Sequence, residues 1–196
     1  MLSAVERRRG AWTIAVFVAT MFITGAVESA MGRQFLGPDG RFGLWEGDIW
    51  SSEQSQRLAD PYSFTHVVHG LLFYGILWMA ARNLWVGRRF LIAVCLEAAW
   101  ELLENSPFII DRYRAATIAL GYQGDSVLNS LSDVLVMALG FWLAFKVKVR
   151  WSVGIAIALE LGMLLWVRDN LALNILMLIH PIGAIKSWQM AGAPGR

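Results

Sequence analysis

Six long apolar stretches, separated by short polar or basic segments, make up most of the sequence. Each is roughly 15 to 20 residues long, close to the length that a helix needs to cross the hydrocarbon core of a bilayer. The pattern predicts an all-α, polytopic transmembrane helix bundle of about six spans, formed by a single membrane domain over residues 1–196. The predicted spans are residues 11–27, 63–81, 90–104, 126–145, 151–167 and 171–185.

The last predicted span is interrupted by Pro181, which has no backbone N–H to donate. Whether this stretch crosses fully is left open. The longest segment between spans is the predicted outer loop 31–62.

Basic residues predict the orientation of the bundle. Lysines and arginines cluster before the first span, between the second and third, between the fourth and fifth, and after the sixth. Short cytoplasmic loops retain Lys and Arg, so the N-terminus is expected to be cytoplasmic. Of the acidic residues, only Glu6 falls on that side. The basic residues that set this side are Arg7, Arg8, Arg9, Arg82, Arg88, Arg89, Lys146, Lys148, Arg150, Lys186 and Arg196.

Composition excludes several classes of protein. The chain is 57% hydrophobic and 16% charged, whereas soluble domains are about 45–50% apolar and about 25% charged. The single cysteine, Cys95, excludes an intramolecular disulfide and any CxxC motif. The net charge of +2 comes with basic residues in loops, so no nucleic-acid partner is expected. The expected partner is membrane lipid, and a protein partner stays unknown.

Three consecutive spans each carry a polar stripe at helical spacing. Ionisable side chains inside a membrane are costly, so they usually face the bundle interior and have partners or a function. The stripes consist of His66 and His69 on the second span, Glu97, Glu101, Glu104 and Asn105 on the third, and Asp125, Ser126, Asn129, Ser130 and Asp133 on the fourth.

The three stripes are expected to meet at one depth. A helix rises about 1.5 Å per residue, which puts all of them in the outer half of the bilayer under the predicted topology. Glu28, at the outer end of the first span, reaches the same level. The sequence therefore predicts a polar His/carboxylate cavity that opens toward the outer face.

Imidazoles and carboxylates are ligands for Zn²⁺, Mn²⁺ or Fe²⁺, and residues three or four apart on a helix can reach one ion. The hypothesis is a hydrolytic metal site with His66, His69 and Glu101 as ligands, and with Glu104 or Asp133 as the acid or base. Neither HExxH nor the Glu-x-x-His pair of di-iron bundles is present on these spans. The other predicted cavity residues are Glu28, Glu97, Asn105, Asp125, Ser126, Asn129 and Ser130.

Two arginines follow the third span. Arg112 and Arg114 are candidates to bind a substrate phosphate at the mouth of the cavity, and pairing with Asp111, Asp125 or a lipid headgroup is the alternative.

Three functions remain open at this stage. The preferred one is a metal-dependent enzyme that acts on a lipid or lipid-linked substrate. A small proton-coupled transporter that uses Glu97, Glu101 and Glu160 is the second, although the inner halves of the second and third spans are nearly apolar. The third is a non-catalytic assembly subunit, in which the polar side chains hydrogen-bond helices together.

Several motifs resemble an uncharacterised family of bacterial multi-pass inner-membrane proteins that carries a domain-of-unknown-function label. They are Thr-His-Val-Val-His-Gly at 65–70, the acidic segment 97–107, Asp-Arg-Tyr at 111–113 and the polar segment 124–133. The resemblance covers the first span through the fourth. It implies a plasma-membrane protein and no established activity.

Overall fold

The computed structural model describes residues 3–193, and within that range the regular structure is helical apart from one isolated bridge between Trp45 and Ala59. Four of the described helices are long and apolar enough to cross a membrane, namely α1 (Ala4–Ala30), α2 (Ser63–Ala80), α5 (Val127–Lys146) and α6 (Val149–Val167). The prediction of an all-α protein is therefore confirmed, and these four helices are candidate membrane spans. α3 (Val86–Glu104) is 19 residues long, but it carries several charged side chains.

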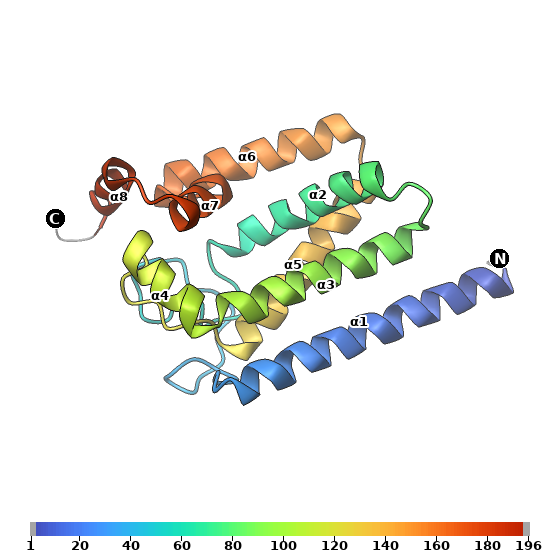
Figure 1. Ribbon diagram of the computed structural model, residues 1–196, viewed down its shortest axis with the longest axis horizontal. Coiled ribbons are helices and arrows are strands. Elements are labelled where there is room, and N and C mark those ends of the chain that lie inside the picture. Colours follow the sequence, from blue (N-terminus) through green and yellow to red (C-terminus); the bar gives the residue numbers. More distant parts are fainter. Residues whose placement is uncertain (1–2, 194–196) are drawn as a thin grey trace.

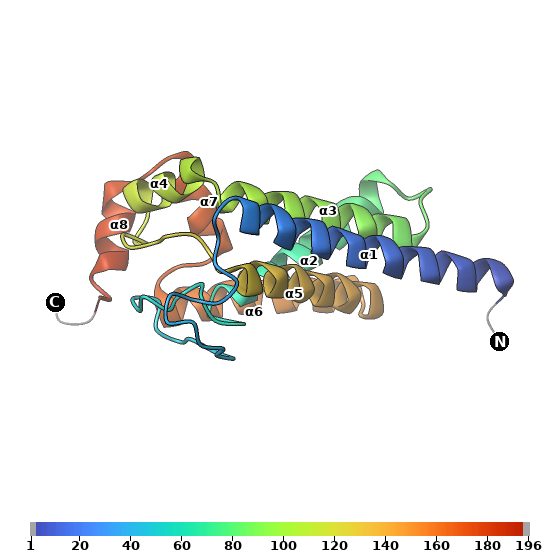
Figure 2. The ribbon, with the colours of Figure 1, turned by 90° about the horizontal axis from the view of Figure 1, so that it is seen from below.

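The five long helices run side by side, with their connections at two ends (Figures 1 and 2). One end holds the start of α1 and the α2–α3 and α5–α6 turns, and we call it the basic end because the arginines and lysines between residues 82 and 89 and between 146 and 150 lie there. The opposite end, called the site end, holds the segment 31–62 and three short helices. These are α4 (Pro107–Ala116), α7 (Leu171–Ile179) and α8 (Gly183–Met190).

Helices α2 and α5 pack backbone against backbone. A Cβ atom at Gly70 would overlap the backbone of Met137, and one at Gly140 would overlap the backbone of Val67. Small residues at a membrane helix interface allow this close approach. The contact brings the polar stripe of α2 next to that of α5, one turn closer to the site end.

The interior toward the basic end is apolar. Its buried cluster consists of Ala93, Val94, Val134, Met137 and Phe141. Packed against this cluster are aromatic and aliphatic side chains from α1, α2 and α3. Among the described residues, the polar stripes are thus closed off on this side by a layer of hydrocarbon.

The predicted sixth span, 171–185, is not a single helix. The chain forms α7 and α8 instead, with a break from His180 to Ile182. Pro181 causes the break, because its ring and its missing N–H oppose helix continuation and push the preceding residue out of the α region. At 9 and 8 residues, neither helix covers a ~30 Å hydrocarbon core, since the rise is about 1.5 Å per residue.

The placement of Lys186 is a second correction. It was expected at the cytoplasmic, basic end, but its Nζ donates to the carbonyl oxygen of Ala115 on α4, at 2.8 Å. The C-terminal part of the described chain therefore stays at the site end (Figure 1). Arg196, the other basic residue predicted there, lies outside the described residues.

Two side chains, one carboxylate and one amide, cap the N-terminus of α7. The carboxylate of Glu160 accepts hydrogen bonds from the backbone N–H groups of Leu171 and Ala172, and Asn170 caps the helix by accepting from Leu173. An anionic group is favourable at a helix N-terminus. Glu160 is therefore engaged at the start of α7, away from the polar stripes.

The segment 31–62 contains no helix and binds to the start of α5. The N–H of Val127 donates to Gln34 and that of Ser126 to Ser55, so free amides at the helix N-terminus are satisfied by loop carbonyls. Within the segment, Nη2 of Arg57 lies 2.7 Å from Oδ2 of Asp39 and 3.0 Å from Oε2 of Glu53, so these ion pairs stabilise its conformation. Residues 31–62 therefore cover the site end, and we call them the covering segment.

Candidate functional site

A cavity of about 320 Å³ lies at the site end, between α2, α3, α5 and α7 and under the covering segment. Most of the predicted polar stripe residues line it, from all three helices. None of the described residues that line it is a lysine or an arginine. Its titratable lining residues are Asp60, Tyr62, His66, His69, Glu97, Glu104, Tyr113, Tyr122, Asp125, Asp133 and Asp169.

Glu97 holds both histidines. Its Oε1 lies 2.6 Å from Nδ1 of His66 and 2.9 Å from Nδ1 of His69. A carboxylate is an acceptor only, so each imidazole donates its Nδ1–H and keeps the lone pair of its Nε2. Carboxylates commonly orient metal-binding histidines in this way.

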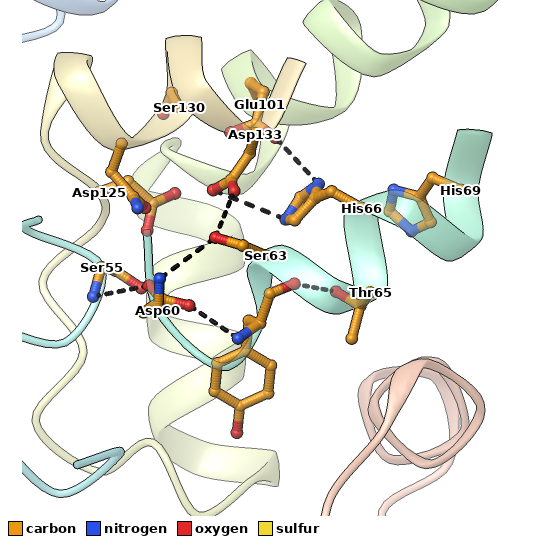
Figure 3. A network of polar contacts seen from close by, with 12 residues as sticks. Ser55, Asp60, Ser63, Thr65, His66, His69, Glu101, Asp125, Ser130 and Asp133 are labelled. Carbon is orange, nitrogen blue, oxygen red and sulfur yellow. Dashed lines mark hydrogen bonds and ion pairs between the residues drawn. The ribbon is translucent and has the colours of Figure 1, made fainter. Parts of the chain in front are cut away.

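The imidazole of His66 on α2 points toward Glu101 of α3 and Asp133 of α5 (Figure 3). Its Nδ1 is 3.6 Å from Oε1 of Glu101, and its Nε2 is 3.7 Å from Oδ2 of Asp133. Both distances exceed that of a normal hydrogen bond. The three groups therefore surround a point without bonding to one another.

Glu101 is the least satisfied of these side chains. It is only 1% exposed, and neither carboxylate oxygen has a hydrogen-bond partner in the part of the chain that the structure describes. A buried charge needs a partner, because the loss of hydration is costly. A bound cation is one group that would supply that partner.

Within residues 3–193, three sets of His, Asp and Glu side chains place one ligand atom each within 4.8 Å of one another. The first is His66, His69 and Glu97, the second is His66, Glu101 and Asp133, and the third is Glu101, Glu104 and Asp125. The donors are imidazole nitrogen and carboxylate oxygen, which suit Zn²⁺, Mn²⁺ and Fe²⁺. Asp133, predicted as an acid or base, stands here among the potential ligands.

Two residues before α2 belong to the site although the sequence analysis did not single them out. The hydroxyl of Ser63 donates to Oδ1 of Asp133 at 3.0 Å (Figure 3). Asp60 accepts hydrogen bonds from the backbone N–H groups of Tyr62 and Ser55, and burial raises its pKa. The signal was the Asp-Pro-Tyr-Ser sequence at 60–63 that precedes the second span, which is typical of a helix start.

A second polar contact links α3 to the segment before α5. Asn105 and Asp125 bond reciprocally, with the Asn105 amide 3.1 Å from Oδ2 and the Asp125 N–H 2.7 Å from the Asn105 oxygen. Tyr122 donates to Oδ1 of Asp125 at 2.9 Å. Burial raises the pKa of Asp125 to about 6. Glu104 lies beside Tyr113, and burial together with the charge of Glu104 raises the pKa of that phenol.

A third contact closes the cavity from the C-terminal side, again from residues that the sequence analysis did not single out. Tyr62 donates to Oδ2 of Asp169 at 3.0 Å, and Gln189 of α8 donates to Oδ1. Burial raises the pKa of Asp169 to about 6. The only local signal was a polar Arg-Asp-Asn triplet between two apolar stretches.

Three predicted cavity residues hold the local structure together. Ser126 caps α5 by accepting from the N–H of Asn129, and the Asn129 amide donates to the Arg57 carbonyl of the covering segment. Ser130 accepts from the Asn105 amide. Glu28 of α1 is fully buried close to Ser130. Of these four, only Asn129 lines the cavity.

The two candidate phosphate-binding arginines contact protein carbonyls. Arg112 donates to the carbonyls of Leu178 and Ile179 at the end of α7, and Arg114 donates to that of Tyr122. Cations are favourable at a helix C-terminus. Neither side chain lines the cavity.

Comparison with known proteins gives the family. The model described as "Protein of unknown function (DUF2585)" matches residues 28–191. The chain is 48% identical over 186 residues to a UPF0314 protein of Sphingopyxis alaskensis, which is 94% of this chain and 97% of that protein. It is 51% identical over 161 residues to one of Paracoccus denitrificans, which is 82% of this chain and 83% of that protein.

A UPF0314 protein of Rhizobium meliloti is 47% identical over 184 residues, which is 94% of this chain and 93% of that protein. No solved structure matches the chain. These matches confirm the resemblance drawn from the motifs, and the chain belongs to this bacterial family of proteins of unknown function (DUF2585).

Proposed function

We propose that this protein is a metal-dependent enzyme of the inner (plasma) membrane that hydrolyses a lipid or a lipid-linked substrate. The observation that carries the proposal is the buried, unpartnered carboxylate of Glu101 beside His66 and Asp133. In the proposal these three side chains hold a divalent cation, with Zn²⁺, Mn²⁺ and Fe²⁺ as the candidates. Ser63 and Glu97 orient two of the ligands.

The shape of the cavity supports an amphiphilic substrate. Its polar wall is continuous with an apolar one formed by Leu72 and Ile76 of α2 and Ile175 of α7. These side chains are 46%, 52% and 47% exposed, so they face outward as well as into the cavity. An acyl or prenyl chain can lie along them while its head group reaches His66.

The negative charge of the cavity favours a bound cation as the group that binds the head group of the substrate. An anionic phosphate is repelled by a cavity that has many carboxyls and, among the described residues, no Lys or Arg, unless a metal ion lies between. A neutral acyl oxygen finds no cationic side chain among these lining residues either. A bound divalent ion polarises such an oxygen and lowers the pKa of a bound water.

His69 is placed to handle the proton of that reaction. Its Nδ1 is bonded to Glu97, which leaves Nε2 free in the cavity. In the proposed step the water oxygen bonds to the acyl carbon or phosphorus and the bond to the leaving oxygen breaks. His69 takes the proton from the water and returns it to the leaving oxygen, so the imidazole ends as it began.

The other two hypotheses are less well supported. A proton-coupled transporter needs a polar route to the basic end, and the described core there is apolar. An assembly subunit held together by polar contacts would satisfy its buried carboxylates, and Glu101 is unsatisfied.

The test incubates the detergent-purified protein with a bacterial total lipid extract and Mn²⁺, Zn²⁺ or Fe²⁺, and follows the lipids by mass spectrometry. We expect at least one lipid species to be hydrolysed by the wild type, and not by His66→Ala or after EDTA. Asp111→Asn, at an exposed carboxylate of α4, is the matched control and should retain activity. A lipid profile that no metal changes would overturn the proposal.

A further inference from the structure

We infer that the site holds two divalent cations and that Glu101 is the carboxylate shared between them. One position is formed by His66, Glu101 and Asp133, and the other by Glu101, Glu104 and Asp125. This inference rests on the proposed function, because it takes the site to be a metal site and adds the number of ions and the ligands of the second.

Glu101 is the residue common to both sets. A carboxylate has two oxygens and can give one to each of two ions. Both oxygens of Glu101 are buried, and neither accepts a hydrogen bond from any described residue. A single ion bound through one oxygen would leave the other unsatisfied in a dry interior, whereas two ions satisfy both.

The charges of the two sets balance with two ions. Together they contain four carboxylates, from Glu101, Glu104, Asp125 and Asp133, and one imidazole. Two divalent cations neutralise four carboxylates, whereas one leaves two negative charges in a cavity whose described lining has no Lys or Arg. Glu97 needs no ion, because it accepts from both histidines.

Asp133 in the first position and Asp125 in the second are each oriented by hydrogen bonds from neighbouring side chains. Asp133 accepts from Ser63 through Oδ1, which leaves Oδ2 on the side of His66. Asp125 accepts from Asn105 and from Tyr122. Outer hydrogen bonds of this kind orient metal ligands and are costly to remove.

The geometry needed is that of known two-metal sites, in which the ions lie about 3.5–4 Å apart and share a bridging ligand. In such sites one ion binds the attacking oxygen and the other the leaving oxygen, which suits hydrolysis of a phosphoester. Phosphatases and nucleases are among the enzymes with such sites, so the substrate class inferred here is a lipid whose scissile bond lies at a phosphate.

The experiment loads the full-length protein in detergent with Mn²⁺ and measures bound manganese per chain together with the electron paramagnetic resonance spectrum. We expect two ions per chain and an exchange-coupled spectrum for the wild type. Asp125→Asn and Glu104→Gln, each taken separately, should bind one ion with the spectrum of isolated Mn²⁺. The control Asp111→Asn should behave as the wild type.

The outcomes separate this inference from the proposed function. One ion per wild-type chain with an uncoupled spectrum overturns the second position and leaves a metal site in place. No bound ion overturns both. If a variant fails to fold, as judged by its circular dichroism, the coupling in the wild-type spectrum decides the question alone.

Discussion

Oε1 of Glu97 lies 2.6 Å from Nδ1 of His66, across the contact between α3 and α2. The same oxygen lies 2.9 Å from Nδ1 of His69, so one carboxylate on α3 sets the orientation of both imidazoles on α2. Both Nε2 atoms are then free to act as a ligand or a base. Glu97 is best understood as a positioning residue for the histidines.

Glu97→Gln is expected to weaken metal binding without removing the site. A glutamine oxygen still accepts from one imidazole, but the charge that makes His66 a stronger ligand is lost. Loss of such an outer partner typically reduces metal affinity about 10–100-fold. Isothermal titration calorimetry with Zn²⁺ measures the affinity, and the number of ions bound at saturation should stay unchanged. An affinity within twofold of the wild type would show that Glu97 does not orient the ligands.

Gly70→Ala is expected to destabilise the bundle, because the new Cβ would overlap the backbone of Met137. Overpacking against backbone costs about 1–3 kcal/mol or more. Gly75→Ala is the matched control on the same helix, since a Cβ there meets nothing within 4 Å. The measurement is the melting temperature in detergent, which should fall for Gly70→Ala and stay or rise for Gly75→Ala. Equal effects would mean that α2 and α5 are not in this close contact.

A reporter fused after Gly192 is expected to lie on the same side of the membrane as one fused after Arg114. A Cβ atom added at Gly192 would lie 3.1 Å from Cδ of Arg168, which places Gly192 near the start of α7, at the site end. An alkaline phosphatase fusion, active only outside the cytoplasm, should be active at both positions and inactive after Arg89, because basic loops stay inside. Opposite activities at Arg114 and Gly192 would restore a complete sixth crossing.

Asp169 gives a pH dependence of stability with a definite sign. Burial raises its pKa from 3.8 to about 6 in the folded protein, so the folded state holds a proton that the unfolded state loses first. The free energy of unfolding then falls as the pH rises from about 4 to about 6, and is level above that. The melting temperature of Asp169→Asn minus that of the wild type should therefore increase over this range. A difference that stays flat or decreases would contradict the raised pKa.

Periodicity predicted the part of the site that lies on long helices. The i, i+4, i+7 spacing of Glu97, Glu101 and Glu104 puts them on one face of α3, and the structure brings that face to His66 and to Asp133. Gly70, which follows His69, makes the close contact between α2 and α5 possible. These inferences succeed because the rotation per residue is fixed within a helix.

Contacts made by loops could not be read in the same way. Asp60 and Asp169 reach the cavity only because the chain turns before α2 and after α6, and neither lies in a periodic stretch. The sequence indicates a break at Pro181, but not that the chain after it folds back at the site end. Once α7 ends, Lys186 and Gln189 find partners on α4 and at Asp169, so the chain folds back at the site end.

The most direct measurement is the transition-metal content of the wild type and of Glu101→Gln, both extracted without chelator, soaked in Zn²⁺, Mn²⁺ or Fe²⁺, and analysed by mass spectrometry. Glu160→Gln is the matched control, because Glu160 caps α7 outside the cavity. We expect stoichiometric metal in the wild type and in Glu160→Gln, and its loss in Glu101→Gln. Wild-type protein that retains no metal after soaking, or Glu101→Gln that binds as much as the wild type, would contradict a metal site at Glu101.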